Sequence, residues 1–486
     1  MSWGRDGISA LTTIILALIL GPSDFGLVVI ALTIVGVIEL FVSMGFVGAI
    51  VQRVDLEDID LDSIFWLTLG LGLTLTIGGA ACAGLVAGYL EIAGLVPIIQ
   101  ALSLSVLIRG LTVVQEAKLT REMNFKSLAL RTNLSMIGGA VVGLLMAVWG
   151  AGVWALVGQS LARGVFGLIM LWRAAHWIPK LRIHWQHTRE MVIFSIKYFP
   201  ATLFDYFGSQ AEPLIIGKFF GPAAVGIYRL AMRLIDLIIT VVTRALWYVS
   251  FPYFAEAKGD AAILRVRIVD CLRYSALFSL PVLAIVGLES PALVQWFGPK
   301  WSQASDVIRI LCVYGALRAL VLFMGPLLVA LGRPQHFSMI MGLQVTSLCV
   351  GFAVAGVFLS DADVQTQVSG IAWTRVAIYA GVFLPIAVWV MMRGTGGSLA
   401  ALGSSVVPGL AVGAAASVVQ IMLLPVTEWM QAPAVVGIVL RSTCAGVAAV
   451  LAILLVDSRV RSTVGRVYRS RILGVVAPAE PGASSS

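Results

Sequence analysis

Residues 24–50 have the sequence DFGLVVIALTIVGVIELFVSMGFVGAI, an apolar run of 27 residues in which Asp24 and Glu39 are the charged members. A helix rises 1.5 Å per residue, so about 20 residues are enough to cross the roughly 30 Å hydrocarbon layer of a bilayer. This run is therefore long enough to span a membrane.

The rest of the chain repeats this pattern. Of its 486 residues 59% are hydrophobic and 12% are charged, against roughly 25% charged in soluble proteins. Division at charge clusters and at Gly and Pro predicts an all-α, polytopic membrane protein of about fourteen transmembrane helices. The N-terminal apolar run, at about residues 8–20, could be the core of a signal peptide. It is expected to be a retained helix, because no small-x-small cleavage site follows it. The expected spans are 3–20, 24–50, 64–89, 94–117, 128–148, 153–172, 191–216, 225–247, 264–288, 304–330, 337–359, 367–391, 400–424 and 434–456.

Lysine and arginine are distributed unequally between the two sets of predicted loops. One set, together with the C-terminal tail, contains twenty of them, whereas the opposite set contains Lys218 and Lys300. Because basic loops remain on the cytoplasmic side, both termini are expected in the cytoplasm. The loop 173–190 is then cytoplasmic and the loop 289–303 faces outward. The net charge of +8 is explained by this distribution, so no nucleic-acid partner is expected.

Two short patterns recur along the chain. Gly-Pro-x-x-apolar-Gly occurs at 21–26 and at 221–226, and Leu-x-Arg-x-x-x-Phe occurs at 119–125 and at 331–337. Both patterns fall at matching places in the predicted topology, which indicates two homologous six-helix lobes, arranged as parallel repeats around a central cleft. The predicted organisation is an N-terminal lobe at 1–175, a cytoplasmic linker at 176–190, a C-terminal lobe at 191–393, two extra helices at 394–457, and a basic, then disordered cytoplasmic tail at 458–486.

Several segments resemble a known family. GPSDFGL (21–27), GFVGAIVQR (45–53), EAKLTREMNFKSLALR (116–131) and ALGRPQHF (330–337) are similar to segments of the polysaccharide-biosynthesis (O-unit/lipopolysaccharide) flippases. Those proteins belong to the multidrug/oligosaccharidyl-lipid/polysaccharide exporter (MOP) superfamily. The resemblance covers roughly residues 10–390. It is interrupted at 18–20, where Leu-Ile-Leu replaces a stretch in which relatives often have arginine.

The resemblance implies two six-helix lobes around a cleft, and a transporter rather than an enzyme. The implied activity is to move a polyprenyl-diphosphate-linked oligosaccharide, or a related glycolipid, from the inner to the outer leaflet of the bacterial inner membrane by alternating access. The implied partners are that lipid-linked sugar and membrane lipids, with H⁺ or Na⁺ as the coupling ion and a monomeric state. The alternative is a multidrug or cation antiporter of the same superfamily. No cofactor is expected.

Charged side chains inside the predicted spans are the candidate site. Arginine suits a phosphate group, because its planar fork donates two parallel hydrogen bonds. Charges within spans usually face a cavity or the interior of a bundle. The expected substrate-binding residues are Arg229, Arg233, Arg109, Arg163, Arg318 and Arg375.

Acidic residues inside the spans are expected to be coupling residues or counter-ions. Arg229, Arg233 and Asp236 have the spacing i, i+4 and i+7 of one helix face, so Asp236 either neutralises Arg233 or leaves it for the substrate. Asp205 and Glu212 precede Pro213, and Glu39 has no local partner in the sequence. No metal site is expected, because the five cysteines lack ligand spacing. The acidic run at 58–62 and the histidines of the linker are expected to be solvated surface rather than divalent-ion sites.

Overall fold

The computed structural model describes residues 2–53, 55–92, 94–395, 398–429 and 434–456, so the expected tail at 458–486 lies outside the described residues. These residues form helices joined by short turns, with no β-strand among them, which confirms the predicted all-α class. The helices are α1 (Ser2–Ile19), α2 (Pro22–Ser43), α3 (Phe46–Gln52), α4 (Asp58–Leu90), α5 (Leu95–Gly110), α6 (Val113–Arg121), α7 (Phe125–Val148), α8 (Val153–Ala175), α9 (Trp185–Gln210), α10 (Glu212–Ala255), α11 (Ala261–Phe297), η1 (Pro299–Trp301), α12 (Ala304–Val321), α13 (Met324–Ala330), α14 (Pro334–Leu359), α15 (Val364–Ile378), η2 (Tyr379–Phe383), α16 (Leu384–Thr395), α17 (Leu399–Trp429) and α18 (Ala434–Val456).

Most of these helices can cross a membrane. The described residues contain ten spans that are long and apolar enough, or eleven if α5 and α6, bent by 41° at their junction, count as one. The chain is therefore a multi-pass membrane protein, whereas the number fourteen stays a prediction. The expected spans outside this set are 3–20, 191–216 and 225–247.

The chain around residue 210 differs from the predicted spans. The expected helix at 191–216 is interrupted, because α9 ends at Gln210 and α10 begins at Glu212. Pro213 favours this new start, since proline lacks an N–H group and fits the first turn of a helix. Gly221 then bends α10, with φ 79° and ψ 177°, a conformation that glycine adopts readily and other residues do not.

The contacts divide the described chain into two compact units. The first unit contains the described residues up to Leu237 together with Val294–Val307 and Ser338–Ile378, and the second contains Ile238–Leu293, Ile308–Phe337 and the described residues from Tyr379 onward. The boundaries between the units fall inside α10, α11, α12 and α14, and between α15 and η2. The expected lobes at 1–175 and 191–393, like the linker and the extra helices, remain predictions.

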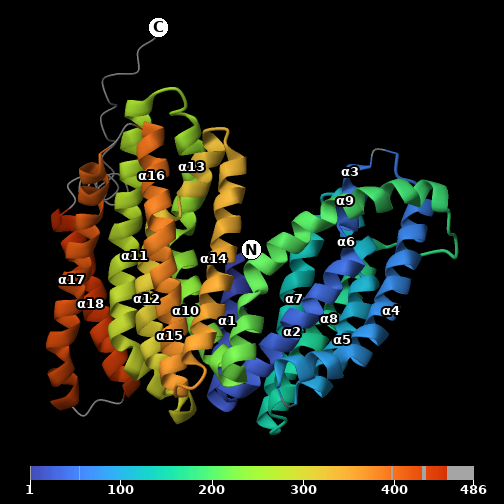
Figure 1. The fold of residues 1–486 in the computed structure, drawn as a ribbon, viewed down its shortest axis with the longest axis horizontal. Helices are drawn as coiled ribbons and strands as arrows, with labels where there is room; N and C mark the ends of the chain where they lie inside the picture. The colour runs from blue at the N-terminus through green and yellow to red at the C-terminus, as the bar shows by residue number, and fades with distance from the viewer. Residues whose placement is uncertain (1, 54, 93, 396–397, 430–433, 457–486) are drawn as a thin grey trace, which may run out of the picture. The chain divides into compact units, whose positions relative to one another are not determined.

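Close helix pairs build the first unit. In Figure 1, α7 lies along α8, and α5 lies beside α4 and α2, in agreement with their contacts. Glycines allow the approach: a Cβ atom on Gly139 of α7 would lie 2.8 Å from the carbonyl oxygen of Gln159 on α8, and one on Gly110 of α5 would lie 2.7 Å from that of Thr68 on α4. Small residues at helix contacts are common in membranes, because they let backbones pack closely.

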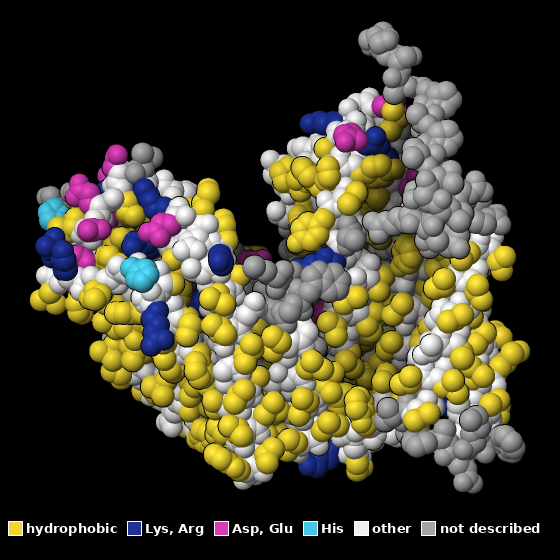
Figure 2. All heavy atoms as spheres, turned by 180° about the vertical axis from the view of Figure 1, so that it is seen from behind, with side chains coloured by type: hydrophobic (Ala, Val, Ile, Leu, Met, Phe, Trp, Pro, Cys, Tyr) yellow, Lys and Arg dark blue, Asp and Glu magenta, His cyan; other side chains and the backbone are white. Residues whose placement is uncertain are grey.

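Charged side chains gather at one end of the first unit, where α3 and the start of α9 lie. Figure 2 shows Lys, Arg, Asp, Glu and His side chains at this end and mostly hydrophobic side chains along the sides of the helices. This arrangement fits a bundle whose sides face lipid and whose charged end faces water.

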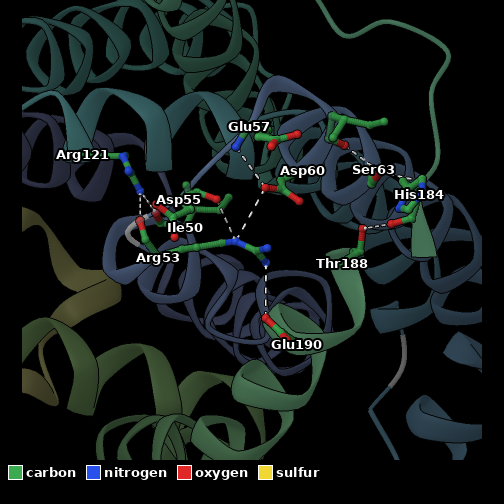
Figure 3. Close-up of polar contacts among 11 residues, drawn as sticks. Ile50, Arg53, Asp55, Glu57, Asp60, Ser63, Arg121, His184, Thr188 and Glu190 are labelled. Carbon is green, nitrogen blue, oxygen red and sulfur yellow. Dashed lines mark hydrogen bonds and ion pairs between the residues drawn. The ribbon is translucent and has the colours of Figure 1, made fainter. Parts of the chain in front are cut away.

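The acidic run at 58–62 is not solvated surface as expected. Asp60 and Asp62 are 0% and 1% exposed. The carboxylate of Asp60 accepts a hydrogen bond from the Glu57 N–H at 3.0 Å, which caps α4, and lies 3.7 Å from Arg53 Nε (Figure 3). A carboxylate is stabilised at a helix N-terminus by the unpaired N–H groups and the helix dipole.

The linker between α8 and α9 is also fixed in place. Its Lys180 N–H donates to Asp62 at 2.9 Å. Its His184 N–H donates to the Ser63 hydroxyl at 2.9 Å (Figure 3). The Trp66 indole donates to the Lys180 carbonyl at 2.8 Å. The segment between α8 and α9, residues 176–184, is therefore docked on the start of α4.

An ion pair joins the other end of α4 to α10. Lys218 Nζ lies 2.7 Å from Glu91 Oε1 and donates to the Tyr89 carbonyl at 2.6 Å. The nearby Lys218 ammonium lowers the pKa of the exposed Glu91 carboxyl below its ordinary value. These two residues belong to the side of the chain that the sequence predicts to face outward.

The second unit is held by a buried charged network. Arg441 of α18 donates to both carboxylate oxygens of Glu289 on α11, at 2.7 and 2.8 Å, and to the Thr427 hydroxyl of α17 at 2.7 Å. Gln420 of α17 donates to the same carboxylate at 2.9 Å. The expected outward loop at 289–303 is accordingly too long, because α11 continues to Phe297 and buries Glu289.

Candidate functional site

Two neighbouring cavities lie within the first unit. One has a volume of about 660 Å³ and the other of about 750 Å³. Helix α2 lines both: Phe25, Val28 and Val29 face the larger cavity, Gly36 and Glu39 face the smaller one, and Leu32 faces both. At 1.5 Å per residue, the stretch from Phe25 to Glu39 is about 21 Å long. The cavities are therefore stacked along α2.

Helix α10 supplies two arginines to this space. Arg229 and Arg233 line the larger cavity together with Asp236, as the spacing of one helix face predicts. Arg229 donates to Gln210 Oε1 at 3.0 Å, and Arg233 donates to the Ser9 hydroxyl at 2.6 Å. Both partners are neutral. Among the described residues Arg233 forms no ion pair with Asp236. The contact by which Asp236 would neutralise Arg233 is therefore not formed in this structure.

A second arginine pair lines the smaller cavity. Arg109 ends α5 and Arg131 lies near the start of α7. Arg109 Nη1 lies 2.6 Å from Glu116 Oε2, and Arg131 Nη1 lies 3.7 Å from Glu116 Oε1. One carboxylate on α6 is thus shared by two guanidinium groups.

Arg163 connects the two cavities. It lies at the middle of α8 and lines both of them, as does Arg233. The exposed guanidinium of Arg163 has no hydrogen bond or ion pair with another described residue. Glu39 lines the smaller cavity and accepts a hydrogen bond of 2.6 Å from the Ser105 hydroxyl.

The charge of the lining is strongly positive. Within the described chain five arginines line the two cavities, against the two acids Glu39 and Asp236. Polar neutral groups, such as Ser9, Ser160 and Gln210, complete the walls. The lining is suited to an anionic group that carries more than one negative charge.

Four predicted site residues lie outside these two cavity linings. Arg375 of α15 is 3% exposed and is paired with Glu212, while its guanidinium lies 5.7 Å from the Tyr228 ring centre and 5.9 Å from that of Phe352. Neither member of this pair lines either of the two cavities described above. Arg318 belongs to the second unit, and Asp205 is an exposed residue of α9 outside both linings.

Sequence reasoning missed Arg131 and Glu116. Arg131 follows a cluster of charges at 116–126, so it counts among the twenty basic residues of the predicted cytoplasmic loops and tail. The available signal was its spacing, since Arg131 and Ser135 share a helix face and both line the smaller cavity. Glu116 could be linked to Arg109 and Arg131 only by the fold, which brings α5, α6 and α7 together.

The sequence profile of a family described as "polysaccharide biosynthesis protein" matches residues 15–306, which is more than half of the chain. The chain belongs to the polysaccharide biosynthesis protein family. The predicted resemblance is confirmed.

Individual relatives of this family member support the assignment. The chain is 27% identical over 64% of its length to the succinoglycan biosynthesis transport protein ExoT of Rhizobium meliloti, covering 63% of that protein. It is 25% identical over 61% of its length to the teichuronic acid biosynthesis protein TuaB of Bacillus subtilis, covering 62%. It is 24% identical over 67% to the lipopolysaccharide biosynthesis protein WzxC of Escherichia coli, covering 67%. The match thus spans somewhat less than two thirds of the first two relatives.

Solved structures establish the fold of this family member. The lipid II flippase MurJ, in an inward closed conformation, superposes with a TM-score of 0.69 over 96% of the chain and 98% of MurJ, at 11% identity. An inward-facing multidrug resistance MATE transporter of the MOP superfamily superposes with a TM-score of 0.60 over 79% of the chain and 94% of that protein, at 16% identity. The chain therefore shares the fold of these two solved proteins.

Proposed function

We propose that this protein is a flippase that moves a polyprenyl-diphosphate-linked oligosaccharide, or a related glycolipid, from the inner to the outer leaflet of the bacterial inner membrane. The arginine-lined cavity pair carries the proposal. A diphosphate cannot enter hydrocarbon unaided, because an isolated charge costs several kcal/mol or more to desolvate. The guanidinium groups of Arg163, Arg229 and Arg233 would replace the lost water.

The names of the relatives favour the same role. They include a succinoglycan transport protein, a lipopolysaccharide biosynthesis protein and a lipid II flippase. Alternating access, cytoplasmic termini, a coupling H⁺ or Na⁺ and a monomeric state belong to the proposal as well. Glu39 and Asp236 are the acids of the cavities that could carry such an ion.

A multidrug or cation antiporter is the second candidate, since the MATE transporter shares the fold. A cationic substrate would need an excess of acids or aromatic faces around the cavity. Because five arginines outnumber two acids there, the charge balance favours the flippase.

Reconstitution into liposomes tests the function. The full-length protein is incorporated with an undecaprenyl-diphosphate-linked oligosaccharide, and oxidation of the sugar by external periodate, which does not cross the membrane, reports its leaflet. The wild-type protein is expected to expose all of the sugar, and the Arg163→Ala/Arg229→Ala variant only the half that started outside. Arg173→Ala, an exposed arginine on the same helix as Arg163, is the matched control.

Undiminished translocation by the double variant, at equal protein level, would refute the role of the cavity. Transport of a cationic dye, without any movement of the glycolipid, would favour the antiporter instead.

A further inference from the structure

The five lining arginines are arranged at two levels along α2. Arg229 faces the larger cavity, on the side of Phe25, whereas Arg109 and Arg131 face the smaller cavity, on the side of Glu39. Arg163 and Arg233 face both cavities. Cationic groups therefore follow one another over a stretch of helix about 21 Å long.

The two levels differ in how their arginines are held. The Arg229 guanidinium is bonded to the neutral Gln210 amide at 3.0 Å, so an anion there would find a cation with no acid bound to it. At the other level the Glu116 carboxylate holds Arg109 at 2.6 Å and Arg131 at 3.7 Å. An anion there must compete with Glu116 for the same guanidinium groups.

Glu116 contacts two arginines that line the smaller cavity but does not line that cavity itself. Its carboxylate contacts the Nη1 atom of Arg109 and the Nη1 atom of Arg131. The other N–H donors of the two guanidinium groups remain available to an anion in the smaller cavity. Each guanidinium carries five N–H donors, enough to bind a carboxylate on one side and a phosphate on the other.

We propose that Arg109 and Arg131, positioned by Glu116, form a separate diphosphate-binding station from which the substrate passes by Arg163 and Arg233 to Arg229. We call the first set the Glu116 station and the last residue the Arg229 station. The proposal rests on the flippase function and adds to it a two-step path. Conduction through successive sites requires that each site bind strongly enough to be occupied and weakly enough to be left. Glu116 lowers the affinity of the first site for the diphosphate, because its carboxylate competes with the bound anion for the same guanidinium groups.

Binding and translocation, measured on the same variants, test this path. The full-length protein in nanodiscs is titrated with inorganic pyrophosphate and with farnesyl diphosphate, and liposomes report translocation. Glu116→Gln removes the competing charge and is expected to bind both probes about tenfold more tightly while translocating more slowly. A merely structural role for Glu116 predicts weaker binding instead.

The two stations are then separated by matched neutral variants. Arg229→Gln is expected to weaken overall binding about tenfold, because it removes the station that has no competing acid, whereas Arg131→Gln is expected to weaken binding less. Both variants are expected to slow translocation. Equal loss of affinity in both variants would show a single site and overturn the path. Unchanged or weaker binding by a folded Glu116→Gln variant would also overturn it. If that variant does not fold, the comparison of Arg131→Gln with Arg229→Gln decides alone.

The two probes show whether the lipid contributes to recognition of the diphosphate. They also separate a failure of the proposed station from a failure of the proposed flippase function. Equal affinity for both probes would show that the diphosphate is recognised alone, and preference for farnesyl diphosphate would show that the lipid contributes. Both results agree with the station, whereas failure of the wild-type protein to bind either probe would refute it. Wild-type binding without any glycolipid movement would refute the proposed function and leave the station standing.

Discussion

Gly26 and Pro222 contact each other so closely that a Cβ atom on Gly26 would lie 1.7 Å from the Pro222 carbonyl oxygen. The reciprocal contact exists as well, since a Cβ atom on Gly226 would lie 1.9 Å from the Pro22 carbonyl oxygen. The two copies of the Gly-Pro-x-x-apolar-Gly pattern, 200 residues apart, thus meet face to face. Each glycine is required because its partner's backbone occupies the place of a side chain.

Alanine at these glycines is expected to destabilise the protein. Gly26→Ala or Gly226→Ala forces α2 and α10 apart, and overpacking of this kind costs about 1–3 kcal/mol. Thermal unfolding of the purified protein in detergent measures the loss. Gly84→Ala, on a helix face with nothing within 4 Å, is the control and should match the wild-type protein. Equal stability of Gly26→Ala and Gly84→Ala would contradict the close contact.

Arg375 is expected to stabilise the fold and not to bind substrate. Its side chain is 4% exposed and that of Glu212 is 13% exposed. Arg375→Leu leaves the Glu212 carboxylate unpaired, which costs about 3–5 kcal/mol for a buried pair. The double variant Glu212→Leu/Arg375→Leu should recover much of the stability and should translocate glycolipid. A stable double variant without translocation would restore Arg375 to the substrate site.

Glu289 and Arg441 are expected to fasten α17 and α18 to α11. Glu289→Gln removes the charge that Arg441 needs, in a network whose members are all buried, and should cost about 3–5 kcal/mol. Limited proteolysis of the chain between α16 and α18 is the measurement, with faster cleavage expected in the variant. Ser404→Ala, an exposed position on α17, serves as the comparison. Cleavage at the wild-type rate in Glu289→Gln would mean that apolar packing alone holds these helices.

The Lys218–Glu91 pair is expected to make stability depend on acidity. Lys218 lowers the pKa of Glu91 from its ordinary value of 4.5, so the contribution of the pair is present above that value and is lost as the pH falls through the lowered one. At pH 7 the wild-type protein should unfold at a slightly higher temperature than Glu91→Gln. As the pH falls below the lowered pKa of Glu91, the two unfolding temperatures should converge. The same difference at both pH values would exclude Glu91 ionisation as its cause.

The sequence alone determined the class and the membrane location of this protein. Long apolar runs allow few alternatives to transmembrane helices, because every backbone polar group inside lipid must be bonded within its own helix. The i, i+4 and i+7 spacing of Arg229, Arg233 and Asp236 likewise depends only on helix geometry, and all three line one cavity. The Gly-Pro repeat was visible in the same way, since it consists of local residue identities.

Tertiary structure alone decided which charges belong together. Glu116 meets Arg109 and Arg131, Glu212 meets Arg375 across 163 residues, and Glu289 meets Arg441 across 152. Asp62 is buried because the linker at 176–184 folds back onto α4. Pairing of buried charges depends on which helix faces approach each other, and nothing in the spacing along one helix encodes the position of another. The charged residues of the spans could therefore be found in the sequence, whereas their division into a cavity lining and structural ion pairs required the fold.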